Sequence, residues 1–343
     1  MTRRVYIVDT GGTIGMKKTA EGYAPAPGYL AQRMARMPEL HQPEMPEYWL
    51  HTYDPPLDSA NMMPADWLKI AQDIAAHDEA YDGFVILHGT DTMAYTASAL
   101  AFLLEGLRKP VILTGSQIPL GEIRNDAREN LITSLLLAAH YPIPEVCLYF
   151  GDRLLRGCRA VKVDADGFSA FASPNYPFLG VVGIDIEIDW SRVRGAPADG
   201  AGPLQVAHMV PSHLASLRLF PGLSTEVFAN LLRPPLQGLV LEAFGVGNGP
   251  TDHEPFMRLL REATARGVVV VDCTQCLAGS VDLSGYATGS ALARAGVLSG
   301  YDLTAEAALA KLTYLFGQGL APQRVREWMQ VDMRGEMTVA GGA

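Results

Sequence analysis

Three short segments of this sequence place hydroxyl side chains next to glycine: T-G-G-T at residues 10–13, H-G-T-D-T at 88–92 and T-G-S-Q at 114–117. A threonine hydroxyl is a weak nucleophile until a neighbouring base takes its proton. Backbone N–H groups at glycine turns can stabilise the oxyanion that such an attack creates. These residue types therefore suit acyl transfer from an amide or an ester, with a threonine as the nucleophile.

Lys162 is the candidate base. It lies among small and apolar residues in the run R-G-C-R-A-V-K-V. Such a lysine either extends along an apolar surface to reach water or is partly buried with a lowered pKa, and only the second arrangement would make it a base. With a carboxylate beside it, a second threonine could relay the proton.

Metal, nucleotide and serine-elbow chemistries fit the sequence less well. No two of the eight histidines stand at the i, i+4 spacing of zinc hydrolases. The phosphate-binding glycine patterns and G-x-S-x-G are absent. Cys273 and Cys276 form a lone C-x-x-C, for which packing at a strand end is a better explanation than a redox role. His88 adjoins Gly89 on the strand side, where a hydrogen-bonded core histidine is the more common outcome. We therefore expect no metal and no cofactor.

Each hydroxyl-bearing segment follows a short apolar run that predicts a strand buried on both faces. These runs are Val5–Val8, Phe84–Leu87 and Val111–Leu113. Helices are expected over Tyr95–Leu107 and Asn125–His140, and Asp91 or Thr92 would cap the first of them. Parallel strands separated by helices end at one edge of the sheet, where ligands bind. Three such turns at one edge are hard to explain as separate helix caps, which favours a catalytic cleft.

Two segments between the first two strands could complete this cleft. Met16–Tyr29 is polar and carries Gly and Pro, so it predicts either a mobile lid or a plain surface loop. Tyr23 is the side chain of this segment that is the best candidate for a functional role. Asp58 and Ser59 offer a carboxylate and a hydroxyl in a turn that precedes an amphipathic helix over Pro64–Ala76.

The α/β alternation resumes after Ser191–Pro203, a run dense in Gly, Ala and Pro that predicts a linker. The later strands and helices are expected over Leu236–Leu241, Glu254–Arg266, Val268–Val271, Thr304–Leu315 and Pro322–Gln330. The fold class is therefore α/β with two domains. Residues 1–190 should form the larger one, with a mostly parallel sheet and flanking helices, residues 191–210 the linker, and residues 211–343 a smaller parallel-sheet domain.

The composition is that of a globular chain with material for a large core, since 48% of residues are hydrophobic and 19% are charged. The net charge of −10 argues against nucleic acid and anionic membranes as partners. The apolar run near the N-terminus is too short for a signal peptide, and no stretch approaches the ~18 apolar residues of a membrane span. Four cysteines are too few for a disulfide framework. We expect a cytoplasmic protein.

Two of the motifs are similar to the signatures of a known family. T-G-G-T-I-G at residues 10–15 and H-G-T-D-T-M at 88–93 resemble the signature motifs of the bacterial L-asparaginases. The likeness covers nearly the whole chain, and the runs T-G-S-Q-I-P-L, A-D-G-F-S-A-F-A-S-P-N, G-V-G-N and G-Y-A-T-G-S-A-L-A resemble the cytoplasmic type I branch. The resemblance implies hydrolysis of L-asparagine to L-aspartate and ammonia through a threonine acyl-enzyme. It also implies homodimers, often paired into tetramers.

The resemblance assigns catalytic roles to residues of the N-terminal half. Thr13 is implied as the nucleophile and Tyr23 as the lid residue that orients it. Thr90, Lys162 and Asp91 match the second catalytic set of the family. Asp91 also matches the residue that holds the α-amino group of the substrate.

The resemblance further implies a substrate-binding set. It comprises Asp58, Ser59, Ala60, Gly89, Ser116 and Asn248. Asp58 and Ser59 match the substrate-binding turn of the family. Ser116 matches a position near the scissile amide, and Asn248 matches a residue through which a neighbouring subunit completes the site.

One position departs from the family pattern. The best-studied type I enzymes have an allosteric asparagine site that includes an arginine just ahead of the G-V-G-N run, where this sequence has Glu242. A carboxylate there would repel the carboxylate of the effector. Thr274 and Cys276 match other parts of that site. We therefore expect allosteric activation to be lost or altered.

Three other functions are possible on the same scaffold. A non-catalytic amino-acid sensor on the same scaffold would be expected to lack Thr13 or Lys162, and both are present. A broader asparaginase–glutaminase is also compatible, because substrates that differ by one methylene are distinguished by only ~1–3 kcal/mol. The amidotransferase subunit that resembles asparaginases has a further N-terminal domain, whereas the first motif begins here at residue 10, so that subunit is not the expected one.

Overall fold

The computed structural model describes residues 2–198 and 202–339, so residues 199–201 of the predicted linker lie outside the described part. The chain divides into two compact units, Met1–Val206 and Ala207–Ala343. Both units combine helices with a sheet, as predicted. Among the described residues, none of the helices has the length and apolar character that a membrane span requires.

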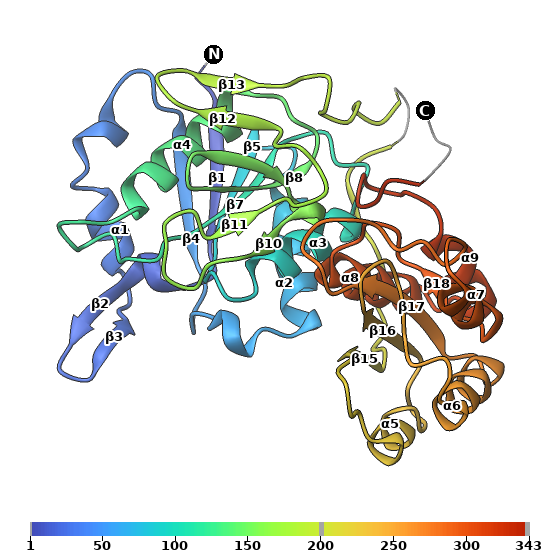
Figure 1. The fold of residues 1–343 in the computed structure, drawn as a ribbon. Helices are drawn as coiled ribbons and strands as arrows, with labels where there is room; N and C mark the ends of the chain where they lie inside the picture. Colours follow the sequence, from blue (N-terminus) through green and yellow to red (C-terminus); the bar gives the residue numbers. More distant parts are fainter. Residues whose placement is uncertain (1, 199–201, 340–343) are drawn as a thin grey trace. The chain divides into compact units, whose positions relative to one another are not determined.

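The first unit is built on an eight-stranded sheet with the order β13-β12-β9-β8-β7-β5-β1-β4 (Figure 1). Its strands are β1 (Arg4–Asp9), β4 (Glu47–Thr52), β5 (Gly83–Leu87), β7 (Val111–Thr114), β8 (Val146–Phe150), β9 (Arg153–Arg156), β12 (Gly180–Val182) and β13 (Ile186–Ile188). The run from β4 to β8 is parallel, which confirms the predicted sheet. The antiparallel strands β9, β12 and β13 were not predicted, because strands of three or four residues are too short to show a period.

The three predicted apolar strands are neighbours, and they end at the same level. Asp9 pairs with Leu87, and Leu87 pairs with Thr114, in parallel register. Every residue of β5 and β7 is buried, as expected for parallel strands covered on both faces. The turns after β1, β5 and β7 therefore leave the sheet along one edge, which confirms the prediction.

The helices and short elements of this unit connect its strands. They are α1 (Tyr29–Met34), α2 (Pro64–His77), α3 (Met93–Leu103), α4 (Ala127–His140), the 3-10 turns η1 (Thr13–Gly15), η2 (Pro38–His41), η3 (Ser59–Asn61) and η4 (Gly157–Arg159), and the strand pairs β10 (Val161–Lys162) with β11 (Phe171–Ala172) and β6 (Leu104–Glu105) with β14 (Gln205–Val206). The helix predicted to end at Leu107 ends at Leu103. Leu104 leaves helical geometry and begins β6, and Gly106 follows with a φ of 79°. The pairing of β6 with a distant strand therefore overrides local helix propensity.

The cap of α3 also differs from the prediction. Thr92 occupies the N-cap position, but its hydroxyl donates to the backbone carbonyl of Ser59 at 2.7 Å and not to the helix. Asp91 is paired with Lys162. Tertiary partners thus take both side chains that a local capping rule assigns to the helix end.

The segment predicted as a loop contains an antiparallel hairpin of β2 (Met16–Thr19) and β3 (Gly22–Pro25). It was not predicted because both strands are mostly exposed and show no alternation of apolar residues. Tyr23 lies on β3 opposite Lys18, and 46% of Tyr23 is exposed. Tyr23, the candidate functional side chain of this segment, therefore lies on a strand and not on a loop.

The second unit contains a four-stranded parallel sheet with the order β15-β16-β17-β18. Its elements are β15 (Leu214–Arg218), α5 (Thr225–Leu231), β16 (Gly238–Ala243), α6 (Glu254–Ala265), β17 (Val269–Thr274), α7 (Ala287–Arg294), β18 (Leu298–Ser299), α8 (Ala305–Gly317) and α9 (Pro322–Met329). The parallel sheet and the strands and helices expected here are confirmed. The short elements β15, α5, α7 and β18 were not predicted.

A buried ion pair ties the segment after α9 to α8. Lys311 Nζ lies 2.6 Å from Glu336 Oε1, and both side chains are fully buried. Lys311 also donates to the carbonyl of Val331, and Glu336 accepts the backbone N–H of Arg334. Burial alone would raise the pKa of Glu336, but the Lys311 charge and the accepted hydrogen bonds lower it to about 2. The stability that the pair contributes is therefore present above the unfolded pKa of about 4.3 and is lost as the pH falls towards 2.

We expect Glu336→Gln to lower the free energy of unfolding by about 3–5 kcal/mol, because Lys311 would stay buried without its counter-charge. Denaturant unfolding of the full chain at neutral pH measures the effect. Glu262→Gln is the matched control, since it breaks the exposed pair with Arg258 and should change stability by less than roughly 0.5 kcal/mol. Equal effects of the two substitutions would contradict a stabilising role for the buried pair.

Candidate active site

The first two glycine turns pack directly on each other, backbone against backbone. Gly12 adopts a φ of 96°, and a Cβ built on it would lie 2.6 Å from the backbone nitrogen of Gly89. Only glycine permits both this conformation and this approach. Thr13, which follows Gly12 and begins η1, is therefore held next to the turn that carries Thr90.

Lys162 reaches the same turn from β10. Its Nζ donates to Thr90 Oγ1 at 2.9 Å and to Asp91 Oδ1 at 2.8 Å. Thr90 is buried, the Lys162 side chain is 20% exposed and the Asp91 side chain is 64% exposed. The Lys162 side chain is thus partly buried at this turn, with a hydroxyl and a carboxylate as its partners. A proton could pass directly between Lys162 and Thr90 in this geometry.

The turn at Asp58 and Ser59 packs on the turn that carries Gly89 and Thr92. Ser59 is buried, and a Cβ on Gly89 would overlap its side chain. Asp58 is exposed and caps η3, because its Oδ1 accepts the backbone N–H of Ala60 at 3.1 Å. The structure therefore brings the predicted substrate-binding turn against the turn that holds Thr90.

The third glycine turn contributes Ser116 and Gln117. Ser116 is buried, and within the described part of the chain its Oγ has no hydrogen-bond partner. Gln117 Oε1 accepts a hydrogen bond from Thr90 Oγ1 at 3.3 Å, while its Nε2 donates to the carbonyl of Gly167 at 3.2 Å. Sequence reasoning did not select Gln117. The sequence feature that could have indicated Gln117 is its place in T-G-S-Q, the turn after β7, because β7 is the neighbour of the strand that precedes Thr90.

Two polar side chains at this edge, Thr10 and His88, are buried and make hydrogen bonds within the core. Thr10 was expected to present its hydroxyl, but the hydroxyl is buried and donates to the carbonyl of Leu87 at 2.9 Å. His88 Nδ1 contacts the carbonyl of Gly89, which can only accept, so Nδ1 carries the proton and Nε2 accepts from the Thr96 hydroxyl. Burial lowers the pKa of His88 to about 4. The prediction of a hydrogen-bonded core histidine is confirmed.

The remaining predicted residues lie in the second unit. Asn248 follows β16, and its Oδ1 accepts a hydrogen bond from the Thr288 hydroxyl. Glu242, on β16, accepts from the Ser216 hydroxyl at 3.0 Å and lies 3.5 Å from a guanidinium nitrogen of Arg218. The Glu242 carboxylate therefore has a cation on the neighbouring strand β15.

Thr274 is the last residue of β17, and it forms a small turn with Cys276. The Thr274 hydroxyl donates to the carbonyl of Gly245 at 2.5 Å and accepts the backbone N–H of Cys276 at 3.0 Å. Cys273 is buried, as expected of a packing cysteine, but Cys276 is exposed, so that expectation was wrong for the second cysteine. The chain turns outward after Cys273, which separates the environments of the two thiols.

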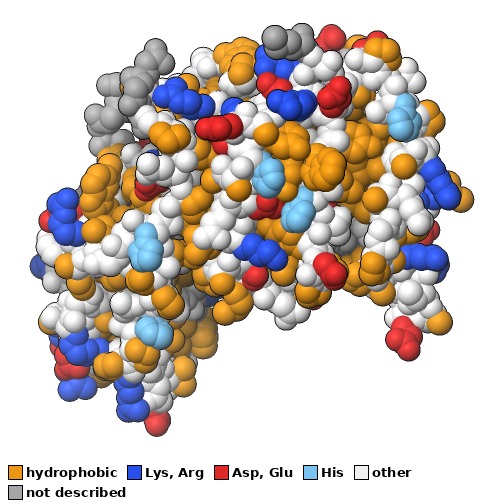
Figure 2. Space-filling view, turned by 180° about the vertical axis from the view of Figure 1, so that it is seen from behind, with side chains coloured by type: hydrophobic (Ala, Val, Ile, Leu, Met, Phe, Trp, Pro, Cys, Tyr) orange, Lys and Arg blue, Asp and Glu red, His pale blue; other side chains and the backbone are white. Residues whose placement is uncertain are grey.

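The charged side chains of the described residues do not form a metal centre. No group of three or more His, Cys, Asp and Glu among them could hold a metal ion. On the face shown in Figure 2, Lys and Arg side chains are interspersed with Asp and Glu. The side chains described at the sheet edge are those of threonine, serine, aspartate, glutamine and one lysine.

The fold and this site define a class: a two-domain α/β protein with hydroxyl side chains and a lysine at the carboxyl edge of a parallel sheet. Residues 4–194 match the family described as Asparaginase, N-terminal, and residues 213–329 match the Glutaminase/Asparaginase C-terminal domain. The chain belongs to the asparaginase family, as its motifs predicted.

Individual relatives match the chain over nearly its whole length. L-asparaginase 1 of Escherichia coli strain K12 is 52% identical over 337 residues, which cover 98% of both chains. The 60 kDa lysophospholipase of Homo sapiens is 46% identical over 98% of this chain and 62% of that protein. The crystal structure of L-asparaginase I from Vibrio cholerae O1 biovar eltor is 51% identical, covers 99% of this chain and 100% of that chain, and has a TM-score of 0.92.

We expect Gly12→Ala to lower the free energy of unfolding by roughly 2–4 kcal/mol, because a positive φ and a backbone collision both oppose a Cβ there. Gly15→Ala in the same turn is the matched control, since its Cβ would meet the Leu30 side chain at 3.6 Å and 3.9 Å, which are ordinary contacts. Thermal and denaturant unfolding of both variants measure the difference. A Gly12→Ala chain as stable as the Gly15→Ala chain would show that the contact with Gly89 is not obligatory.

Proposed function

We propose that this chain hydrolyses L-asparagine to L-aspartate and ammonia through a threonine acyl-enzyme. The single observation that carries the proposal is the contact of Lys162 Nζ with both Thr90 Oγ1 and Asp91 Oδ1, on a turn that packs against the turn of Thr13. The names of the relatives support the same reaction, since two of the three are L-asparaginases.

In the proposed reaction, Thr13 Oγ attacks the carboxamide carbon of the substrate. The carbon–nitrogen bond breaks, and the nitrogen leaves as ammonia with the proton of the threonine. Water then cleaves the ester, which releases L-aspartate and returns a proton to Thr13. Lys162 and Thr90 hold and move the proton, and Tyr23 orients the nucleophile when the hairpin approaches the substrate.

The substrate is proposed to be held by its charged end groups. Asp91 is largely exposed while Lys162 binds its Oδ1, so its carboxylate can also accept from the α-ammonium group. In the turn from Asp58 to Ala60, the Ser59 hydroxyl donates to the α-carboxylate of the substrate, and Ser59 packs on the Gly89 backbone because Gly89 has no Cβ. Ser116 supplies the buried hydroxyl near the scissile amide.

The proposal includes an assembly and a location. Asn248 of one subunit is proposed to complete the site of another in a homodimer or a dimer of dimers. The reaction requires neither metal nor cofactor, and the proposed partner is the small-molecule substrate and not nucleic acid or a membrane. The proposed location is the cytoplasm. A broader asparaginase–glutaminase activity is the alternative within this class, and ammonia release from the two amides distinguishes them.

We expect Thr13→Ala to lower ammonia release from L-asparagine by at least about 1,000-fold, because the hydroxyl that would form the ester is removed. Thr13→Ser, which keeps a hydroxyl, should retain more activity. A coupled ammonia assay measures the rates, and thermal unfolding shows whether both variants stay folded. Turnover by a folded Thr13→Ala chain at the wild-type rate would exclude Thr13 as the nucleophile. A wild-type chain that binds asparagine without turnover would favour the non-catalytic sensor.

We expect the rate to follow a hyperbolic dependence on asparagine concentration, because the paired carboxylate of Glu242 repels the carboxylate of an effector. Initial rates over a wide concentration range measure the shape of the curve. A sigmoidal curve that Thr274→Val makes hyperbolic would show that the allosteric site is functional despite Glu242.

A further inference from the structure

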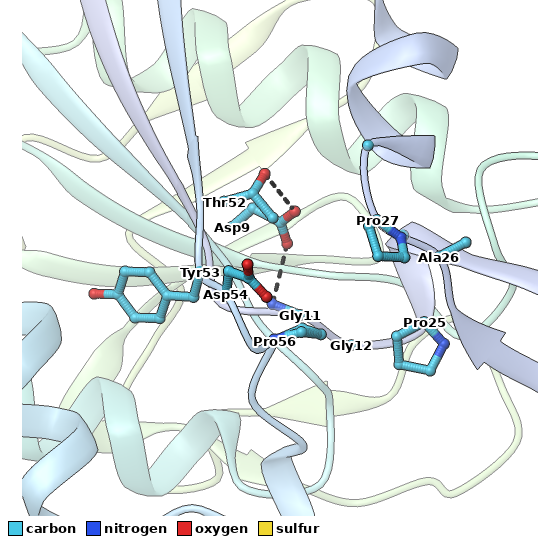
Figure 3. A pocket seen from close by; sticks show the side chains of 12 residues that line it. Asp9, Gly11, Gly12, Pro25, Ala26, Pro27, Thr52, Tyr53, Asp54 and Pro56 are labelled. Atoms are coloured by element: carbon cyan, nitrogen blue, oxygen red, sulfur yellow. Dashed lines mark hydrogen bonds between the residues drawn. The ribbon is translucent and has the colours of Figure 1, made fainter.

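Asp9 is a buried carboxylate to which the proposed function gives no role. It is the last residue of β1, directly ahead of the turn that leads to Thr13, and only 4% of it is exposed. It lines a cavity of about 240 Å³ together with Gly11, Thr52 and Asp54 (Figure 3). Burying a carboxylate is costly unless its oxygens are hydrogen-bonded, so its contacts are informative.

The two oxygens of Asp9 bind two different parts of the first unit. Oδ1 accepts the backbone N–H of Gly11 at 3.0 Å, and Oδ2 accepts the Thr52 hydroxyl at 3.1 Å; Figure 3 marks both bonds. Asp9 and Thr52 are paired in register between β1 and β4, and the carbonyl of Asp9 also accepts the N–H of Tyr53. The side chain therefore connects the start of the nucleophile turn to the edge strand.

The turn needs such support because of its conformation. Gly11 and Gly12 have φ values of 116° and 96°, and because glycine can adopt many other conformations as readily, contacts from the surroundings must hold it in this one. The other anchors lie beside Gly11: Thr10 binds the carbonyl of Leu87, and the N–H of Leu57 donates to the carbonyl of Thr10. Asp9 Oδ1 is the acceptor for the N–H of Gly11 itself.

We propose that Asp9 is a positioning residue, whose carboxylate holds Gly11 so that Gly12 stays packed on Gly89 and Thr13 stays in place to attack the substrate. This inference rests on the proposed function of Thr13. It separates the two contacts of the carboxylate: the bond to Gly11 positions the nucleophile, and the bond to Thr52 only stabilises the sheet edge. A displacement of a nucleophile by about 1 Å can cost on the order of 100-fold in rate.

Steady-state kinetics of four variants of the full chain test the proposal. We expect Asp9→Ala to lower kcat by about 10- to 100-fold with KM within about threefold of wild type. Asp9→Asn keeps an oxygen that can accept from Gly11, so its kcat should stay within about fivefold. Asp9→Glu has room in the adjacent cavity but displaces the oxygens by one methylene, so its kcat should fall at least tenfold. Thr52→Val, the matched control, removes only the second contact and should leave kcat within about threefold.

Hydrogen exchange provides a readout that does not require activity. Exchange at the Gly11 amide should become faster in Asp9→Ala and Asp9→Glu and stay near the wild-type rate in Asp9→Asn and Thr52→Val. If wild-type chain releases no ammonia, the proposed function fails while the exchange pattern still tests the hold on Gly11. Should Asp9→Ala not fold, Asp9→Glu takes its place. The proposal is overturned if Asp9→Ala and Asp9→Glu keep kcat within threefold, if Thr52→Val loses as much as they do, or if Gly11 exchange is unchanged.

Discussion

The structure around the candidate site depends on one close approach, that of the Gly12 backbone to the Gly89 backbone. This approach requires the two turns to begin at the same height, which the parallel register of β1 with β5 provides through the pairing of Asp9 with Leu87. It also requires that Gly12 carry no Cβ, while Gly89 needs to lack one because a Cβ there would collide with Ser59. The nucleophile turn and the turn with Thr90 then lie side by side. Lys162, from a third segment, donates a hydrogen bond to Thr90 at that edge.

The hydroxyl groups at this edge divide into two sets by their partners. Thr10 and Thr114 are buried and donate to backbone carbonyls of neighbouring strands, so they fix the sheet edge. The Thr90 hydroxyl instead bonds the side chains of Lys162 and Gln117, in the contacts described above. A hydroxyl bound by side chains can exchange its proton when those side chains move or titrate, whereas one bound to backbone is committed to the fold. The same residue type therefore serves structure at one position and chemistry at another.

Buried ion pairs fix segments that regular secondary structure leaves loose. Arg156 on β9 lies 2.6 Å from Glu145, and both side chains are nearly fully buried. Glu145 also accepts the backbone N–H of Arg194, so the chain that follows the antiparallel edge is tied back to the sheet. Lys311 and Glu336 do the same for the last described residues of the second unit. Removing one partner of such a pair is costly because it leaves the other charge buried without a counter-charge. The pair therefore favours one path for the chain.

The sequence by itself determined the parallel strands, the convergence of three turns and the family, because apolar runs of strand length and glycine–hydroxyl motifs are local patterns. It did not determine the hairpin at residues 16–25, whose strands carry no apolar alternation. Tertiary structure alone decided that Thr92 binds Ser59, that Gln117 receives the Thr90 hydroxyl and that Asp9 joins Gly11 to Thr52. The bonds from Thr90 to Gln117 and from Thr52 to Asp9 link residues 27 and 43 positions apart. No local pattern encodes such partners, since they are set by which strand ends the sheet brings together.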